Sequence, residues 1–264
     1  MNIVRLRLGL RSASRAPELW RCFRSCENWA TVASAYLGLR EPLYPLEFQT
    51  PFGDSITLET PQDLITAWII FYRREYHVES GYETIIDAGA NIGTFSLFAA
   101  RVAPRARIVA LEPFPDTLTR LQNQVDRNGL AERIACRPWA LTHADGRRFM
   151  DGGPAISQSR GLLGEEVVGR GVAVEGHSLA SVMDREQIAE LDMLKMDVEG
   201  AEHEVFPATP TQVLRRIRHI GLEYHPNGSK SGLFALLTAA GFDLVQDAPT
   251  PLAPNSGVAH FCRN

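Results

Sequence analysis

Several features that would assign the chain to a class of protein at once are missing from its 264 residues. No run approaches the roughly 18 apolar residues that a membrane-spanning helix needs, so we expect no integral membrane segment. The apolar core of a signal peptide is also missing, because Arg5, Arg7, Arg11 and Arg15 interrupt the first residues. These absences favour a cytoplasmic protein.

Cysteine is scarce and scattered, with four residues in the whole chain. Cys22 and Cys26 lack the second cysteine or histidine pair of a structural zinc site, and Cys136 and Cys262 lie far away in sequence. We interpret the first two as small apolar residues on one helix face, in a reducing compartment. The sequence therefore predicts no bound metal.

An excess of positive charge is absent as well, since the net charge is −4. A nucleic-acid-binding protein usually has a basic face, and nucleic-acid methylation is further disfavoured because no N/D-P-P-Y/F motif occurs. With 45% hydrophobic and 22% charged residues, the composition is that of an ordinary globular protein. We expect an enzyme of small or medium-sized substrates, without a nucleic-acid partner.

The most informative stretch present is Thr84 to Glu112. It reads as a buried strand ending at Asp87, a glycine-containing turn, a helix from about Phe95, and a second apolar strand ending at Glu112. Such a βαβ unit makes the two strands parallel neighbours. The two carboxylates therefore end adjacent strands.

The turn of this unit predicts a nucleotide site. Gly89 and Gly93 allow a sharp turn and close approach of a ligand, and the amides of the next helix can meet polar ligand atoms. Glu112 lies 19 residues beyond Gly93, about where an acidic residue binds the ribose hydroxyls in nucleotide-binding βαβ units. The sequence thus indicates an adenosine moiety.

A dinucleotide is not the expected ligand, because the G-x-G-x-x-G fingerprint is missing. The turn instead begins with Asp87, which would repel a pyrophosphate but suits an ammonium group such as that of S-adenosylmethionine (SAM). A dehydrogenase is disfavoured for the same reason. The turn is similar to motif I of methyltransferases.

The strings IIDAGANIGTFS, LEPFPDTLTRLQNQVDRNG and LDMLKMDVEGAEHEVF resemble the FkbM family of SAM-dependent methyltransferases, from roughly Pro51 onward. Ala88 departs from the branched residue that the family often carries. The resemblance implies O-methylation of a hydroxyl on a small-molecule or sugar-like acceptor, with a domain of the same fold that binds SAM without turnover as the alternative. It also implies an α/β, Rossmann-like fold whose seven-stranded, mostly parallel sheet ends in an antiparallel hairpin. The cofactor-binding residues predicted on this basis are Asp87, Gly89, Ala90, Asn91, Gly93, Glu112, Pro113, Trp139, Ala140 and Asp197.

Residues 1–45 are predicted to be a basic, helical extension, and residues 46–264 the methyltransferase domain. We favour packing of the extension on the core over a membrane-surface helix. A substrate lid or a contact in a homo-oligomer stays open. A turn-rich excursion from Asp145 to Gly171 could cover the acceptor. Trp139 is equally suited to stacking on adenine or to core packing.

Two further strands are expected to carry the chemistry. Lys195 and Asp197 lie two residues apart in the strand from Leu191, so both side chains leave one face at the ligand-binding edge of the sheet. We expect them to pair, with Asp197 as a proton acceptor or a cofactor contact and Lys195 lowering the pKa of an acceptor hydroxyl, or to form a purely structural pair. Glu223 and His225 end the next strand, with His225 as a candidate base and Glu223 as its partner. A divalent metal bound by Asp197 and Glu223 would be a second route to a nucleophilic acceptor oxygen. Two carboxylates alone do not support such a site.

Overall fold

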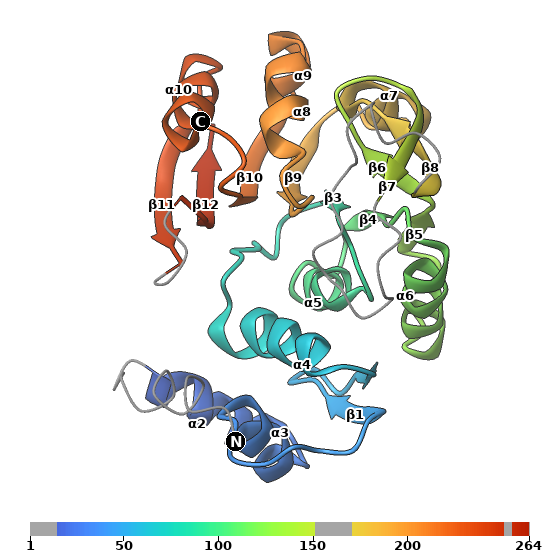
Figure 1. Ribbon diagram of the computed structural model, residues 1–264, viewed down its shortest axis with the longest axis vertical. Helices are drawn as coiled ribbons and strands as arrows, with labels where there is room; N and C mark the ends of the chain where they lie inside the picture. Colours follow the sequence, from blue (N-terminus) through green and yellow to red (C-terminus); the bar gives the residue numbers. More distant parts are fainter. Residues whose placement is uncertain (1–14, 151–170, 251–254, 264) are drawn as a thin grey trace.

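The computed structural model describes residues 15–150, 171–250 and 255–263. Its centre is a seven-stranded sheet in the order β11-β12-β10-β9-β3-β4-β5 (Figure 1). The five strands from β10 to β5 are parallel, and β12 pairs antiparallel with both β10 and β11. The strands are β3 (Thr84–Ala88), β4 (Arg107–Leu111), β5 (Ile134–Arg137), β9 (Leu191–Met196), β10 (Ile217–Tyr224), β11 (Asp243–Pro249) and β12 (Gly257–Cys262). The predicted fold class is confirmed.

Helices cover both faces of this sheet, which explains why its central strands are apolar throughout. In β3, Ile85 and Ile86 are both fully buried but belong to different core clusters, one on each face. One face packs against α5 and α6, and the other against α7 to α10. These helices are α5 (Thr94–Val102), α6 (Pro115–Arg127), α7 (Leu179–Arg185), α8 (Glu202–Ala208), α9 (Thr211–Leu214) and α10 (Lys230–Ala239).

The segment before β3 contributes a hairpin and a bent helix. Strands β1 (Leu46–Gln49) and β2 (Ser55–Leu58) pair antiparallel, and α4 (Pro61–Trp68) begins at a capping box of Thr60 and Asp63. A π-helical stretch, η2 (Ile69–Arg73), continues α4 and ends at Arg74, whose φ of 57° is left-handed. This irregular end delivers Glu75 and Tyr76 to the wall of the cavity described below.

Helices α2 (Ala16–Ser25) and α3 (Trp29–Tyr36) lie beside α4 at the opposite end of the molecule from α8 to α10 (Figure 1). Glu18 accepts a hydrogen bond from Trp68 Nε1 at 2.6 Å, and the Tyr36 ring stacks on Trp68 with 4.1 Å between centroids. Cys22 and Cys26 are buried, free thiols in the same cluster. The described part of the extension thus contacts the core, while a domain boundary at residue 45 remains a prediction.

A smaller sheet of order β6-β8-β7 stands beside the main one, formed by β6 (Trp139–Leu141), β7 (Gly146–Met150) and β8 (Val172–His177). The sequence predicted only parts of it. Residues 151–170 of the predicted covering excursion lie outside the described residues. Among the helices that the structure describes, none has the length and apolarity needed to cross a membrane.

Candidate active site

A cavity of about 650 Å³ opens where the parallel strands end. The turns after β3, β4 and β9 and the end of β10 form its floor, and η2, β6 and the end of β11 contribute walls. Among the predicted site residues, those in its lining are Gly89, Ala90, Asn91, Glu112, Pro113, Trp139, Ala140, Lys195, Asp197 and Glu223. One cavity therefore joins the predicted cofactor residues to three of the four predicted catalytic ones.

A glycine is needed at position 89 because the backbone of another turn of the protein packs closely against it. Its φ is +74°, and a Cβ at this position would lie 1.8 Å from the backbone oxygen of Asp197. The amides of Gly89 and Ala90 both donate to the carbonyl of Leu111, at 3.1 and 2.9 Å. These two amides are therefore already paired within the protein.

Gly93 likewise serves packing. A Cβ on it would lie 2.5 Å from Leu121 Cδ1 on α6, and the residue is not part of the cavity wall. Thr94, which follows it, does line the cavity, and its buried hydroxyl has no hydrogen-bond partner in the part of the chain that the structure describes. Sequence reasoning missed Thr94, although its place directly after the loop glycine at the start of α5 was a signal.

Glu112 lies where the sequence predicts a ribose-binding carboxylate. One of its oxygens accepts from the Asn91 amide at 3.0 Å and the other from the Phe114 amide at 2.9 Å. Burial raises the pKa of Glu112 to about 7, although these two amides and Lys195 act in the opposite direction. Each oxygen keeps capacity to accept a further hydrogen bond.

Asp87 lies beneath the loop. Its side chain is fully buried and is not part of the cavity wall. One oxygen accepts from Ser96 Oγ at 2.7 Å, and the other lies 3.1 Å from Lys195 Nζ. The carboxylate already has a cationic partner, so this geometry does not favour direct contact with a ligand ammonium group.

Lys195 is the cation at the centre of the floor. Its Nζ donates to the Gly89 carbonyl at 2.8 Å and forms ion pairs with Asp87 at 3.1 Å and Asp197 at 3.7 Å. Burial alone would lower the pKa of Lys195, but the two carboxylates outweigh it and the net shift is upward. Lys195 is therefore a permanent cation that holds the loop and Asp197 together.

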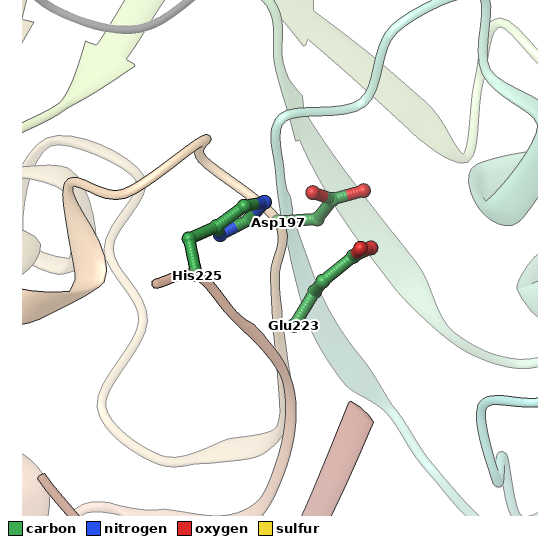
Figure 2. Close-up of side chains that lie close together, drawn as sticks. All are labelled: Asp197, Glu223 and His225. Carbon is green, nitrogen blue, oxygen red and sulfur yellow. The ribbon is translucent and has the colours of Figure 1, made fainter. Parts of the chain in front are cut away.

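Asp197, Glu223 and His225 converge at the other end of the site (Figure 2). Asp197 comes from the turn after β9, and the other two from the end of the neighbouring β10. One ligand-type atom from each residue lies within 4.8 Å of the others. Burial, reinforced by Asp197, raises the pKa of Glu223 to about 8.

His225 is held in place from behind. Its Nδ1 lies 3.0 Å from an oxygen of the fully buried Glu202, which also accepts from the His225 amide at 2.8 Å. Its Nε2 lies 3.4 Å from Glu199. Burial would lower the pKa of His225, but the hydrogen bond to Glu202 and the surrounding carboxylates raise it to about 9. His225 itself is not among the residues of the cavity wall.

The opposite end of the cavity is more apolar and contains Pro113, Trp139 and Ala140. Trp139 is half-buried and meets His177 edge-on at 4.8 Å, with the guanidinium groups of Arg137 and Arg185 5.8 Å from its ring centroid. The ring thus has neighbours of its own and still lines the cavity. Both interpretations of Trp139 remain open.

Two cavity residues near η2 carry unsatisfied polar groups. Glu75 is partly exposed and makes no hydrogen bond or ion pair with any described residue, and the buried hydroxyl of Tyr76 has no hydrogen-bond partner among them. Sequence reasoning missed Glu75. The positions of both residues depend on the π-helical end of α4, which no sequence pattern indicated.

The family model described as the methyltransferase FkbM domain matches residues 87–244. The chain belongs to the FkbM methyltransferase family. The match contains the loop after β3 and the strands β9 and β10. The predicted family, and SAM as its cofactor, are confirmed.

Individual relatives of this FkbM-family chain are methyltransferases too. Methyltransferase sdnD of Sordaria araneosa is 30% identical over 193 residues, which are 62% of this chain and 74% of that protein. The 31-O-demethyl-FK506 methyltransferase FkbM of Streptomyces tacrolimicus is 26% identical, with the same coverage of 62% and 74%. Among solved structures, fibrillarin of Aeropyrum pernix with bound SAM is similar with a TM-score of 0.42 and 12% identity, over 70% of this chain and 67% of that chain.

Proposed function

We propose that this SAM-dependent methyltransferase methylates a hydroxyl group of a small-molecule or sugar-like acceptor. The observation that carries the proposal is that one cavity extends from Glu112 to the carboxylates of Asp197 and Glu223. The name of the Streptomyces relative, which describes a substrate lacking a methyl group on one oxygen, supports oxygen as the atom methylated. The volume of about 650 Å³ lies within the range of small-molecule sites.

The residues present fit SAM. Glu112 offers carboxylate oxygens to the ribose hydroxyls, and the unpartnered Thr94 hydroxyl is available to a polar cofactor atom. Pro113, Trp139 and Ala140 form the apolar end suited to adenine. We propose that Asp87 and Gly93 act indirectly, Asp87 through Lys195 and Gly93 through the packing of α5 on α6.

When bound, SAM supplies a methyl group on a positively charged sulfur, so the protein has little covalent chemistry to perform. Its residues must align the acceptor oxygen and stabilise the loss of the acceptor proton. We propose that Asp197 and Glu223 face the acceptor, since both line the cavity. Lys195 would position Asp197. His225 is less suited to act as a neutral base, because Glu202 and the other carboxylates around it raise its pKa and so favour its protonated form.

Cofactor choice is tested by titrating the protein with SAM and with NAD in a calorimeter. We expect heat from SAM alone, and binding of NAD without SAM would contradict the proposal. Methyl transfer from labelled SAM is then measured across a panel of small hydroxyl compounds, with Asp197→Asn as the variant expected to lose turnover. SAM binding without transfer to any compound would favour a binding domain. A cytoplasmic location, a homo-oligomer and the lack of a nucleic-acid partner stay predictions.

A further inference from the structure

We propose that Asp197, Glu223 and His225 bind a divalent cation of the Mn²⁺ or Mg²⁺ class, and that this ion holds the acceptor oxygen. The three side chains lie close together at two adjacent strand ends (Figure 2). Their candidate ligand atoms lie within 4.8 Å of one another, close enough for one ion to reach all three. Ion binding itself does not depend on the proposed function, whereas the role of the ion does.

The histidine is presented as metal-binding histidines are. A ligating imidazole usually donates its second ring N–H to a carboxylate, which fixes the ring and the tautomer. Here the fully buried Glu202 lies 3.0 Å from Nδ1 of His225 and also accepts from its amide. Glu202 therefore holds Nδ1, which leaves Nε2, now 3.4 Å from Glu199, as the nitrogen that an ion would take.

One buried, unsatisfied group points independently to a missing ligand. The hydroxyl of Tyr76, a residue only 5% exposed that lines the same cavity, has no hydrogen-bond partner among the described residues. It can serve a water molecule or substrate oxygen on the ion. Glu223 is partly buried and makes no hydrogen bond or ion pair with those residues, so its oxygens are available to an ion.

Lys195 pairs with Asp197 at 3.7 Å, but carboxylates outnumber this cation around the three ligands. Glu75 and Glu199 line the cavity beside them, and Glu75 has no ion-pair partner among the described residues. In contrast, Asp63 in the same wall is neutralised by Arg120 at 2.6 Å. Two carboxylates and one imidazole are hard to borderline ligands, suited to Mn²⁺ or Mg²⁺, and they leave coordination positions for oxygen atoms of a substrate.

Such an ion would lower the pKa of a bound acceptor hydroxyl. Methyl transfer then forms the bond from an oxygen lone pair to the methyl carbon and breaks the carbon–sulfur bond, whose electron pair remains on the neutral sulfur. The hydroxyl proton leaves to a carboxylate of the cavity that is not an ion ligand, such as Glu199. The ion thus supplies the acidity that a lone histidine base would otherwise have to provide.

The test is a titration of the chelator-treated full chain with MnCl₂, followed by the electron paramagnetic resonance signal of free Mn²⁺, with competition by MgCl₂. We expect one Mn²⁺ per chain. Glu223→Gln and His225→Gln should each weaken Mn²⁺ binding at least tenfold, about the loss typical of changes around a metal site. Glu112→Gln, a matched carboxylate at the cofactor end of the cavity, should keep Mn²⁺ affinity. Circular dichroism and thermal melts check that each variant folds.

Absence of stoichiometric Mn²⁺ binding would overturn the metal site, and so would Mn²⁺ affinity that both ligand variants leave unchanged. SAM titrated into the chelator-treated protein separates this result from the proposed function. If SAM binds and Mn²⁺ does not, the ion is rejected and the methyltransferase proposal stands. If Mn²⁺ binds and SAM does not, the metal site stands and the proposed function fails.

Discussion

Glu112 combines burial with a ligand-facing position, and this makes cofactor binding sensitive to pH. Its pKa of about 7 means that the carboxylate is largely ionised at pH 8 and largely neutral at pH 6. A neutral carboxyl is the poorer acceptor for ribose hydroxyls. We therefore expect the dissociation constant of SAM to rise by about tenfold from pH 8 to pH 6. Calorimetric titration at both pH values measures the change, and Glu112→Gln should reduce it.

The raised pKa of Glu112 also makes the stability of the folded protein depend on pH. The pKa of Glu112 is about 7 in the folded protein, whereas in the unfolded chain it has its ordinary value of 4.5. The buried charge thus costs stability above pH 7, and this cost disappears below pH 4.5. We expect the change in melting temperature caused by Glu112→Gln to be more positive at pH 8 than at pH 5. An equal shift at both pH values would contradict the assigned cause.

Gly89 allows a direct comparison of backbone strain with steric exclusion. Gly89→Ala adds about 1–2 kcal/mol of left-handed strain and also forces a Cβ against the Asp197 carbonyl, 1.8 Å away. Gly53 has a φ of +88° with nothing within 4 Å of a Cβ, so Gly53→Ala adds the strain alone. Urea denaturation should show a loss at Gly89 that exceeds the loss at Gly53 by more than 1 kcal/mol. Equal losses would mean that the loop can move away from β9.

The contact between α2 and α4 gives the extension a measurable share of stability. Glu18 accepts from Trp68 Nε1, and Trp68 is fully buried. Glu18→Ala would leave a buried indole N–H unsatisfied at a cost of about 1–3 kcal/mol. Urea denaturation measures this loss, and Glu27→Ala is an exposed control in the loop between α2 and α3. No difference between the two variants would argue that the extension is only loosely attached.

Regular elements were predictable because their sequence periods are local. Strand β5 occupies the short run Ile134–Arg137, and the cap at Thr60 marks the start of α4 as its chemistry requires. The left-handed turn at Arg74 and the π-helical η2 were not predictable, because no residue there has a distinctive preference for them. Glu75 was missed for this reason.

The candidate site was predictable as an edge of the sheet, but the contacts within it were not. Parallel strands bring Glu112, Lys195, Asp197 and Glu223 to one edge, which sequence spacing alone indicates. That Lys195 reaches across to Asp87 depends on the register of β3 with β9, which sets Asp87 opposite Lys195. Asp87 was therefore predicted to contact a ligand, whereas in the structure its partners are Lys195 and Ser96.

The molecule as a whole should gain stability from its cofactor. SAM at about 100 times its dissociation constant adds about 2.7 kcal/mol to the free energy of unfolding. For a chain of this length, each kcal/mol raises the melting temperature by about 2–4 °C. A thermal melt should therefore shift upward by about 5–10 °C with SAM. NAD at the same concentration should leave the melt unchanged, and an equal shift with both would indicate non-specific binding.

The position of β12 between β10 and β11 has a consequence for folding of the chain during its synthesis. Until Gly257–Cys262 has been synthesised, β10 has only β9 as a neighbour, and the other side of the strand that contains Glu223 is open. A ribosome-bound chain must therefore wait for its closing strand, with a pairing edge exposed to other nascent chains. A premature stop codon upstream of this strand should give aggregates rather than a smaller, partly active enzyme.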